Sequence, residues 1–233
     1  MKFVTQKSML VSLLAVLPFV ASAQMSSNIS LTTNYKFRGQ DQDQLPLTDK
    51  SKGFKPALQG GFDYAFGNGF YVGNWNSSVA WLDGNSLEVD VYGGYKGELS
   101  PGLSYDAGVI AYMYPGNSLG KTTEVYLGMG YGPFSAKYSQ TVSNDYFYYG
   151  SKASYFNVGY ATELTAGLTL KAAVGMTNFK DSTKVDFSDY SLGLSYDLGD
   201  GYSLGGAYVG ATNKSAYGFA NDNRVILSLS KAM

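Results

Sequence analysis

The residue types that usually carry catalysis are scarce in this chain. The sequence contains no histidine and no cysteine, so neither a Ser-His-Asp centre, nor a Cys-His centre, nor a zinc site built on those ligands can form. The nearest candidate pair for carboxylate chemistry is Glu88 and Asp90, which lie two residues apart on one face of an expected strand. Pairing with basic groups is the simpler role for these acids. We therefore expect no enzyme activity, no cofactor and no metal.

Two sets of charged residues are expected to face each other across the interior of the molecule. The basic set is Lys36, Arg38 and Arg224, and the acidic set is Glu88, Asp90 and Glu124. Such opposed walls are typical of a porin constriction, where rows of charge select what passes. The alternative is an ion-pair network that plugs the interior, since buried ions require partners. Further residues expected to line the interior in either case are Asp63, Lys96, Asp106, Lys137 and Lys171.

A recurring turn predicts the elements that position these charges. Short Gly-bearing breaks recur about every 33 residues, which indicates an array of similar supersecondary units. They are Gly67-Asn68-Gly69, Ser100-Pro101-Gly102, Gly132-Pro133, Ala166-Gly167 and Gly199-Asp200-Gly201. Between them lie looser and mostly longer breaks, at 39–53, 83–85, 115–120, 143–150, 177–185 and 211–222. Alternating short turns and long loops are typical of an outer-membrane β-barrel with its short turns in the periplasm.

The segments between these breaks predict twelve strands, an even number as bacterial single-chain barrels require. They span about 28–38, 55–66, 70–82, 86–98, 103–114, 121–131, 134–142, 152–164, 168–177, 186–198, 202–211 and 223–231. The sixth alternates clearly, with Val125, Leu127 and Met129 on one face and Glu124 on the other. A soluble sheet also has a period of two. The small or polar opposite faces and the low charge favour a barrel with its apolar face in lipid.

The first residues predict export. Residues 1–23 carry Lys2 and Lys7, then an apolar run of about a dozen residues, then Ala21-Ser22-Ala23, the pattern of a cleaved helical signal peptide. A membrane-spanning helix would need about 20 apolar residues. Cleavage would change the net charge from −1 to −3. Residues 24–233 are expected to form one domain, because no linker or low-complexity stretch divides them.

Aromatic residues gather at the ends of the predicted strands, as they do at the two lipid–water interfaces of a barrel. Those at the short turns are Tyr64, Phe66, Phe70, Tyr71, Tyr131, Phe134, Tyr196 and Tyr202, and those at the opposite ends are Tyr35, Phe37, Trp81, Phe187, Tyr190 and Tyr208. The general preference of aromatics for strands is the alternative explanation. The aromatic loop 145–150 is expected either to gate or bind a solute or to pack on the rim.

Several of these stretches together resemble a known family. They are Tyr35-Lys36-Phe37-Arg38-Gly39, Leu58-Gln59-Gly60-Gly61, Gly69-Phe70-Tyr71-Val72-Gly73-Asn74-Trp75 and Leu87-Glu88-Val89-Asp90-Val91-Tyr92-Gly93-Gly94-Tyr95. This pattern is similar to the Gcw_chp family of proteobacterial outer-membrane proteins, also called TorF-type porins, whose substrate is unknown. The resemblance implies an outer-membrane barrel and transport. The last residues, Lys231-Ala232-Met233, depart from the terminal aromatic that outer-membrane barrels usually present during assembly.

The sequence thus predicts an all-β protein, a 12-stranded antiparallel transmembrane β-barrel in a bacterial outer membrane. Its expected function is porin-like passive diffusion of small hydrophilic solutes through a charged lumen. The alternative is a closed structural or surface-interaction barrel with an ion-paired, plugged interior. Expected partners are outer-membrane lipid, a small hydrophilic solute and the barrel-assembly machinery. Nucleic acid is not expected, since the mature chain is acidic.

Overall fold

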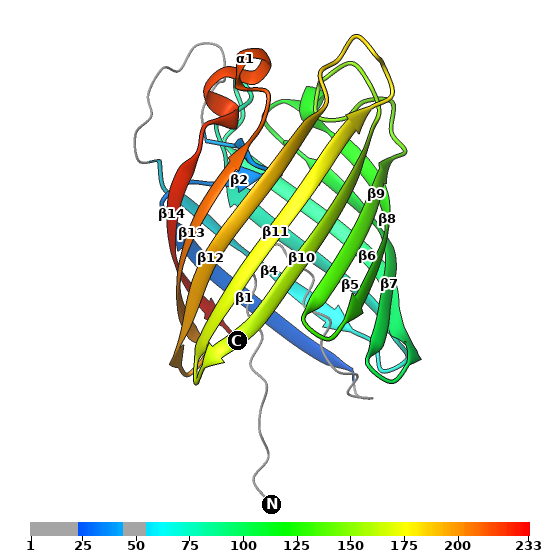
Figure 1. Ribbon diagram of the computed structural model, residues 1–233. Coiled ribbons are helices and arrows are strands. Elements are labelled where there is room, and N and C mark those ends of the chain that lie inside the picture. Colours follow the sequence, from blue (N-terminus) through cyan, green and yellow to red (C-terminus); the bar gives the residue numbers. More distant parts are fainter. Residues whose placement is uncertain (1–22, 44–54) are drawn as a thin grey trace, which may run out of the picture.

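Twelve antiparallel strands close on themselves into a barrel (Figure 1). The computed structural model describes residues 23–43 and 55–233. The barrel strands are β1 (Gln24–Thr32), β4 (Ala57–Ala65), β5 (Phe70–Ser78), β6 (Leu87–Ser100), β7 (Leu103–Met113), β8 (Thr122–Tyr131), β9 (Phe134–Thr141), β10 (Ala153–Thr165), β11 (Leu168–Phe179), β12 (Phe187–Gly199), β13 (Tyr202–Ala211) and β14 (Arg224–Ala232). Each strand pairs with its neighbour in sequence, and β1 pairs with β14 to close the ring. The predicted fold class is confirmed.

The shorter elements all belong to one end of the barrel. They are β2 (Lys36–Phe37), β3 (Gln40–Asp41), η1 (Ser118–Gly120), α1 (Lys214–Tyr217) and η2 (Gly218–Asn221). We call this the long-loop end and the opposite one the short-turn end. The recurring Gly-bearing breaks all fall at the short-turn end, where both β1 begins and β14 ends (Figure 1). Within the described residues, no helix has the length and apolar character needed to cross a membrane.

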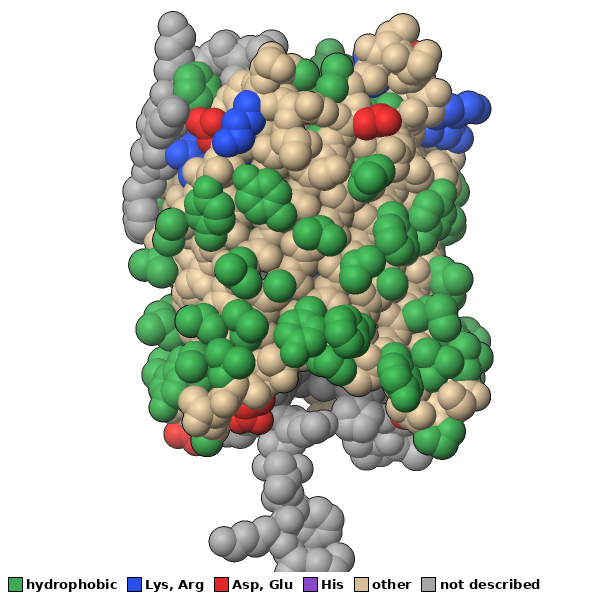
Figure 2. Space-filling view, viewed as in Figure 1, with side chains coloured by type: hydrophobic (Ala, Val, Ile, Leu, Met, Phe, Trp, Pro, Cys, Tyr) green, Lys and Arg blue, Asp and Glu red, His purple; other side chains and the backbone are tan. Residues whose placement is uncertain are grey.

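Strand alternation places apolar side chains outside and polar ones inside. On β8, Val125, Leu127 and Met129 are between 41% and 53% exposed, whereas Glu124 on the opposite face is buried. The other strands repeat this pattern, and hydrophobic side chains cover much of the wall while charged ones lie toward its two rims (Figure 2). An apolar exterior around a polar interior is the inverse of a soluble barrel and suits lipid contact.

The first predicted strand is wrong in its bounds, because β1 ends at Thr32 rather than continuing to residue 38. The Thr32 hydroxyl donates to the Asn34 carbonyl (3.0 Å), and the Tyr35 N–H donates to the Asp43 carboxylate (3.1 Å). These bonds hold the chain in a turn directly after the strand. Lys36 therefore lies on a small two-stranded hairpin instead of the barrel wall. The predicted signal peptide, residues 1–23, lies almost entirely outside the described residues.

The aromatic belt is confirmed at the short-turn end and is partly wrong at the long-loop end. Phe66, Phe70, Tyr131 and other predicted members at the short turns are exposed on the outer wall. Tyr71 is an exception, since its hydroxyl donates to Asp106 inside the barrel. At the long-loop end, Tyr35, Phe37, Trp81 and Phe187 pack in an interior aromatic cluster instead of facing lipid.

Candidate functional site: the long-loop mouth

A short hairpin crosses the inside of the long-loop mouth. It consists of β2 and β3 joined by Arg38 and Gly39, and we call residues 36–41 the inner hairpin. Both central residues have positive φ, +49° and +76°, the geometry of a two-residue turn whose twist matches a hairpin. One end of the inner hairpin contacts Glu124 on β8 and the other contacts Arg224 on β14. These two strands lie six positions apart in either direction around the ring, so the inner hairpin spans the full lumen.

Arg38 is the contact on the β8 side. Its Nη1 and Nη2 atoms donate to the two carboxylate oxygens of Glu124 at 2.9 and 2.6 Å, and Nη1 also donates to the Tyr146 hydroxyl at 3.3 Å. The guanidinium carbon lies 4.1 Å from the centre of the Tyr155 ring, a distance at which a cation is attracted to an aromatic face. Burial opposes the charge of Arg38, but the Glu124 carboxylate outweighs this effect and raises the guanidinium pKa above its ordinary value.

Asp41 is the contact on the β14 side, and it joins two cations. Its carboxylate lies 3.2 Å from Lys36 Nζ and 3.0 Å from Arg224 Nη2, and the side chains of Lys36 and Asp41 are fully buried. The Lys36 ammonium also donates to the carbonyls of Gly39 and Ala220, at 2.8 and 2.9 Å. Burial lowers the pKa of Lys36, and the Asp41 carboxylate opposes that shift. Asp41 was not among the residues predicted from the sequence. The one local signal was its position in the strand that follows the Arg38-Gly39 turn.

Aromatic rings fill the space around the inner hairpin. Phe37 packs edge to face on Tyr112 and Phe147, with ring centroids 5.5 and 5.3 Å apart. Tyr146 and Phe147 come from the aromatic loop 145–150 and are buried, whereas Tyr148 of the same loop is exposed. Other members of the cluster are Tyr35, Trp75, Trp81, Tyr114, Tyr149, Phe179, Phe187 and Tyr217. The mouth is thus packed like a small protein core around a few ion pairs.

The predicted acidic pair lies beside this core. Glu88 and Asp90 point inward from β6 with 0% and 5% of their surface exposed, and the Tyr114 hydroxyl donates to Glu88 at 2.8 Å. Asp90 stands opposite Trp75 on β5 and opposite Tyr112 on β7. The second oxygen of Glu88 and Oδ1 of Asp90 accept no hydrogen bond from a described residue. In the described ranges no group of three or more acidic side chains is arranged to hold a metal ion.

The structure corrects the picture of two opposed walls. Arg38 is predicted on the first strand, but it lies on the inner hairpin and reaches across to bond Glu124 directly. Lys36 and Arg224 are likewise joined through Asp41. Arg38 and Glu124 are therefore the members of the two sets that pair with each other. Lys36 and Arg224 pair instead with Asp41, which belongs to neither set, and Glu88 and Asp90 lie outside these ion pairs.

The remaining predicted lining residues lie nearer the short-turn end, on inward strand faces. The Tyr92 hydroxyl donates to Asp63 and the Tyr71 hydroxyl donates to Asp106, both at 2.6 Å. Three inward lysines accompany these acids, and none forms an ion pair with a described residue. Lys137 Nζ lies 3.9 Å from the centre of the Tyr126 ring and Lys96 Nζ lies 5.4 Å from that of Tyr71, while Lys171 points inward from β11.

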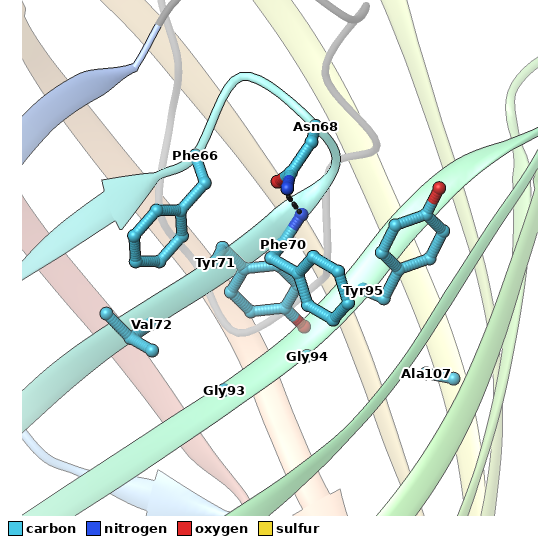
Figure 3. A pocket seen from close by; sticks show the side chains of 9 residues that line it. All are labelled: Phe66, Asn68, Phe70, Tyr71, Val72, Gly93, Gly94, Tyr95 and Ala107. Carbon is cyan, nitrogen blue, oxygen red and sulfur yellow. Dashed lines mark hydrogen bonds between the residues drawn. The ribbon is translucent and has the colours of Figure 1, made fainter.

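A shallow hollow of about 620 Å³ lies on the outer wall near the short-turn end. Figure 3 shows the rings of Phe66, Phe70 and Tyr95 around it, with no side chain over Gly93 and Gly94. Since Phe70 and Tyr95 are exposed on the lipid side, the hollow lies outside the lumen and is separate from the charged interior.

Solved porins share this architecture. The KdgM porin superposes with a TM-score of 0.57 over 88% of this chain and 98% of its own, at 12% sequence identity. The NanC porin gives a TM-score of 0.56 over 90% and 98%, at 10% identity. A structure of the KdgM porin in complex with disordered oligogalacturonate gives 0.54 over 90% and 98%, at 10% identity. At these identities the likeness is one of fold.

Sequence comparison defines the family. No curated protein matches the chain. The profile of a family described as "Bacterial protein of unknown function (Gcw_chp)" matches residues 20–232. That match covers the whole barrel, including the inner hairpin and every inward charge discussed above. The chain therefore belongs to the Gcw_chp family and has the fold of a 12-stranded porin.

Proposed function

We propose that this protein is a porin-like channel of the bacterial outer membrane that lets small hydrophilic solutes diffuse through a charged lumen. The observation that carries this proposal is the inverted barrel, with apolar side chains outside and rows of ionisable side chains inside. A barrel that only anchored surface loops would gain nothing from unpaired inward lysines such as Lys137 and Lys171. The inner hairpin would be the constriction. The N-terminus would be periplasmic, with the long loops outside.

A second candidate is a closed barrel that serves structure or surface interaction. The ion pairs of Arg38 with Glu124 and of Asp41 with Arg224 favour it, because they tie the inner hairpin to opposite walls. Under this reading the inner hairpin is a permanent plug. The two candidates differ in whether solute ever passes the mouth.

Reconstitution of the mature protein in a planar lipid bilayer separates them. We expect discrete channel events from folded protein, identified by its heat-modifiable migration on a gel. The expected conductance is below that of wide 16- to 18-stranded porins, because a 12-stranded ring is narrower and the inner hairpin occupies it. Folded protein that inserts but conducts nothing would leave the closed barrel as the function.

Ion selectivity gives a sharper test of the charged lumen. Glu88 and Asp90 lie outside the mouth's ion pairs, and buried acids without a basic partner are charged only at a pH high enough to ionise them. Under a salt gradient at alkaline pH we therefore expect the wild-type channel to prefer cations. Asp90→Asn should shift the reversal potential toward anions without breaking an ion pair. Glu98→Gln, at an exposed position near the short-turn end of the same strand, is the matched control. Equal reversal potentials for both variants would contradict a role of the buried acids in selection.

A further inference from the structure

The side chains that surround the tip of the inner hairpin form a ready-made receptor for a planar cation. Glu124 comes from β8, Tyr155 from β10 and Tyr146 from the loop between β9 and β10, and we call these three residues the Arg38 pocket. They supply two carboxylate oxygens, a hydroxyl and an aromatic face to one guanidinium. All three belong to the barrel wall or its loop, and none belongs to the inner hairpin. The Phe37 ring of the inner hairpin also lies 4.8 Å from the Arg38 guanidinium carbon, but the carboxylate fork, the hydroxyl and the Tyr155 face are supplied by residues outside the hairpin.

The acidic groups next to this pocket also favour a bound cation. Tyr112 lies between Glu124 and Asp90, since its hydroxyl donates to Glu124 at 3.4 Å and its backbone stands opposite Asp90. Glu88 lies one inward position further along the same strand as Asp90. Without Arg38, the remaining groups described as hydrogen-bonding to Glu124 and Glu88 are tyrosine hydroxyls, and Lys137 is a cation that acts on Glu124 electrostatically. Buried charges without partners are strongly unfavourable, so an emptied pocket would take up either a proton or a positive ligand.

The chemistry of the lining narrows the class of ligand. The described acids are not arranged as a metal site, and the aromatic faces suit a weakly hydrated organic cation better than a small hard ion. The fork of oxygens on Glu124 matches the parallel N–H groups of a guanidinium. An alkylammonium would keep the charge and the aromatic contact but lose the second parallel bond.

We propose that the Arg38 pocket is a binding site for guanidinium compounds and, more weakly, small alkylammonium cations, and that Arg38 occupies it as an intramolecular ligand. In an open channel a permeating cation would replace Arg38 in this pocket, and that step rests on the proposed channel function. Binding of a cation to the emptied pocket does not depend on it. Because Arg38 is tethered at a high effective concentration, the wild-type pocket is filled and responds weakly to free ligand. Removal of the Arg38 side chain exposes it.

Arg38→Gly and Arg38→Asn are suitable variants, since φ at this position is +49° and both residues accept a left-handed turn. We expect millimolar guanidinium or methylguanidinium chloride to raise the unfolding temperature of the detergent-solubilised variants above that in potassium chloride of equal ionic strength. The gain should grow with the logarithm of ligand concentration, as for a ligand that binds only the folded state. Methylammonium should act more weakly, and the wild type should respond little.

Two controls make the result specific. Arg38→Gly combined with Glu124→Gln keeps the space but removes the charged fork, so the guanidinium effect should disappear. Lys171→Ala removes an inward cation that has no carboxylate or aromatic partner described, so it should gain no guanidinium response. Stabilisation that persists without the Glu124 carboxylate, or that potassium reproduces, would overturn the proposal. So would failure of both Arg38 variants to fold while Glu124→Gln folds, since an exchangeable site must tolerate being empty.

The outcome is separable from that of the channel proposal. Guanidinium stabilisation without any channel events would keep the binding site and reject transport. Channel events together with no guanidinium response in the Arg38 variants would keep transport and reject the site.

Discussion

Arg38 donates three side-chain hydrogen bonds and lies against three aromatic rings at the mouth. Its backbone adopts a left-handed conformation that costs a non-glycine residue of the order of 1 kcal/mol. The bidentate bond to Glu124 and the contact with the Tyr155 ring compensate for this cost. A buried ion pair is not in itself evidence of stability, because its gain offsets the desolvation of both charges. Its value here is positional: it fixes where the tip of the inner hairpin lies.

Removal of one partner of this pair tests that view. Glu124→Gln leaves the Arg38 guanidinium buried without its counter-charge, so we expect a loss of about 3–5 kcal/mol in the free energy of unfolding. Equilibrium urea unfolding in detergent measures it. Glu98→Gln, an exposed glutamate near the short-turn end, should change stability by less than about 0.5 kcal/mol. If the two variants unfold alike, Glu124 does not hold a charged Arg38 in the folded protein.

For single residues, the sequence predicted which strand face a side chain occupies better than it predicted which residues would pair with each other. The inward orientation of Glu88, Asp90 and Glu124 followed from strand parity, which needs only correct strand bounds. The position of Arg38 did not, because it depends on a turn after Thr32 that is held by side chains such as Asp43. No local pattern indicates that Asp41 pairs with Arg224, which is 183 residues away.

The inner hairpin is the element that converts an ordinary barrel into a narrow-mouthed one. It fits because Gly39, at its turn, packs directly against the wall: a Cβ at this position would lie 2.7 Å from the Asp189 Cβ and 2.7 Å from the Gly210 carbonyl. Backbone atoms of β13 cannot move aside without breaking the ladder to β12. The close approach therefore admits glycine alone.

Gly39→Ala should displace the inner hairpin. We expect it to cost about 1 kcal/mol for the left-handed backbone and a further 1–3 kcal/mol, roughly, for overpacking. If the channel proposal holds, single-channel conductance should also rise. Gly84→Ala is the matched control, since Gly84 has a similar φ of +72° but its nearest contact would be at 3.9 Å. Similar losses of stability in the two variants would show that crowding at the wall is unimportant.

The strands and the inner hairpin differ in how predictable they are, for a physical reason. Each barrel strand turns one face outward, where apolar residues predominate at alternate positions, and this makes the pattern visible. β11 and β13 accordingly lie within two residues of their predicted bounds. The inner hairpin has protein on all sides, so its residues follow no period. Its contacts come from β8, β14 and distant loops, and sequence patterns carry no information on such pairings.

Across the whole molecule, the inward charges differ between the two ends. Among the described residues, the long-loop half holds Lys36, Arg38 and Arg224 together with a larger number of buried acids, namely Asp41, Asp43, Glu88, Asp90, Glu124 and Asp189. The short-turn half holds Lys96, Lys137 and Lys171 with Asp63 and Asp106. Three further acids stand on the inward strand faces at the short-turn rim, namely Glu98, Glu163 and Asp197. A solute that crosses the barrel would therefore meet an acidic mouth, then the three lysines, and then acids again at the short-turn rim. Because the inward charges vary along the lumen, ion selectivity should be measured before conductance.

The lipid-facing wall is the feature on which the membrane assignment depends, and it can be tested apart from any channel. Val174 lies midway along β11, points outward and is 60% exposed. In a lipid bilayer, Val174→Arg should lower the free energy of unfolding by about 2–4 kcal/mol, the cost of a cation on a barrel's lipid face near the membrane midplane. Val185→Arg, on the long-loop end and also exposed, should cost less than about 1 kcal/mol, because its arginine stays in water. Equal tolerance of both arginines in bilayers would mean that the apolar wall does not face lipid, whereas a loss confined to Val174→Arg would locate the hydrocarbon layer around the middle of the barrel.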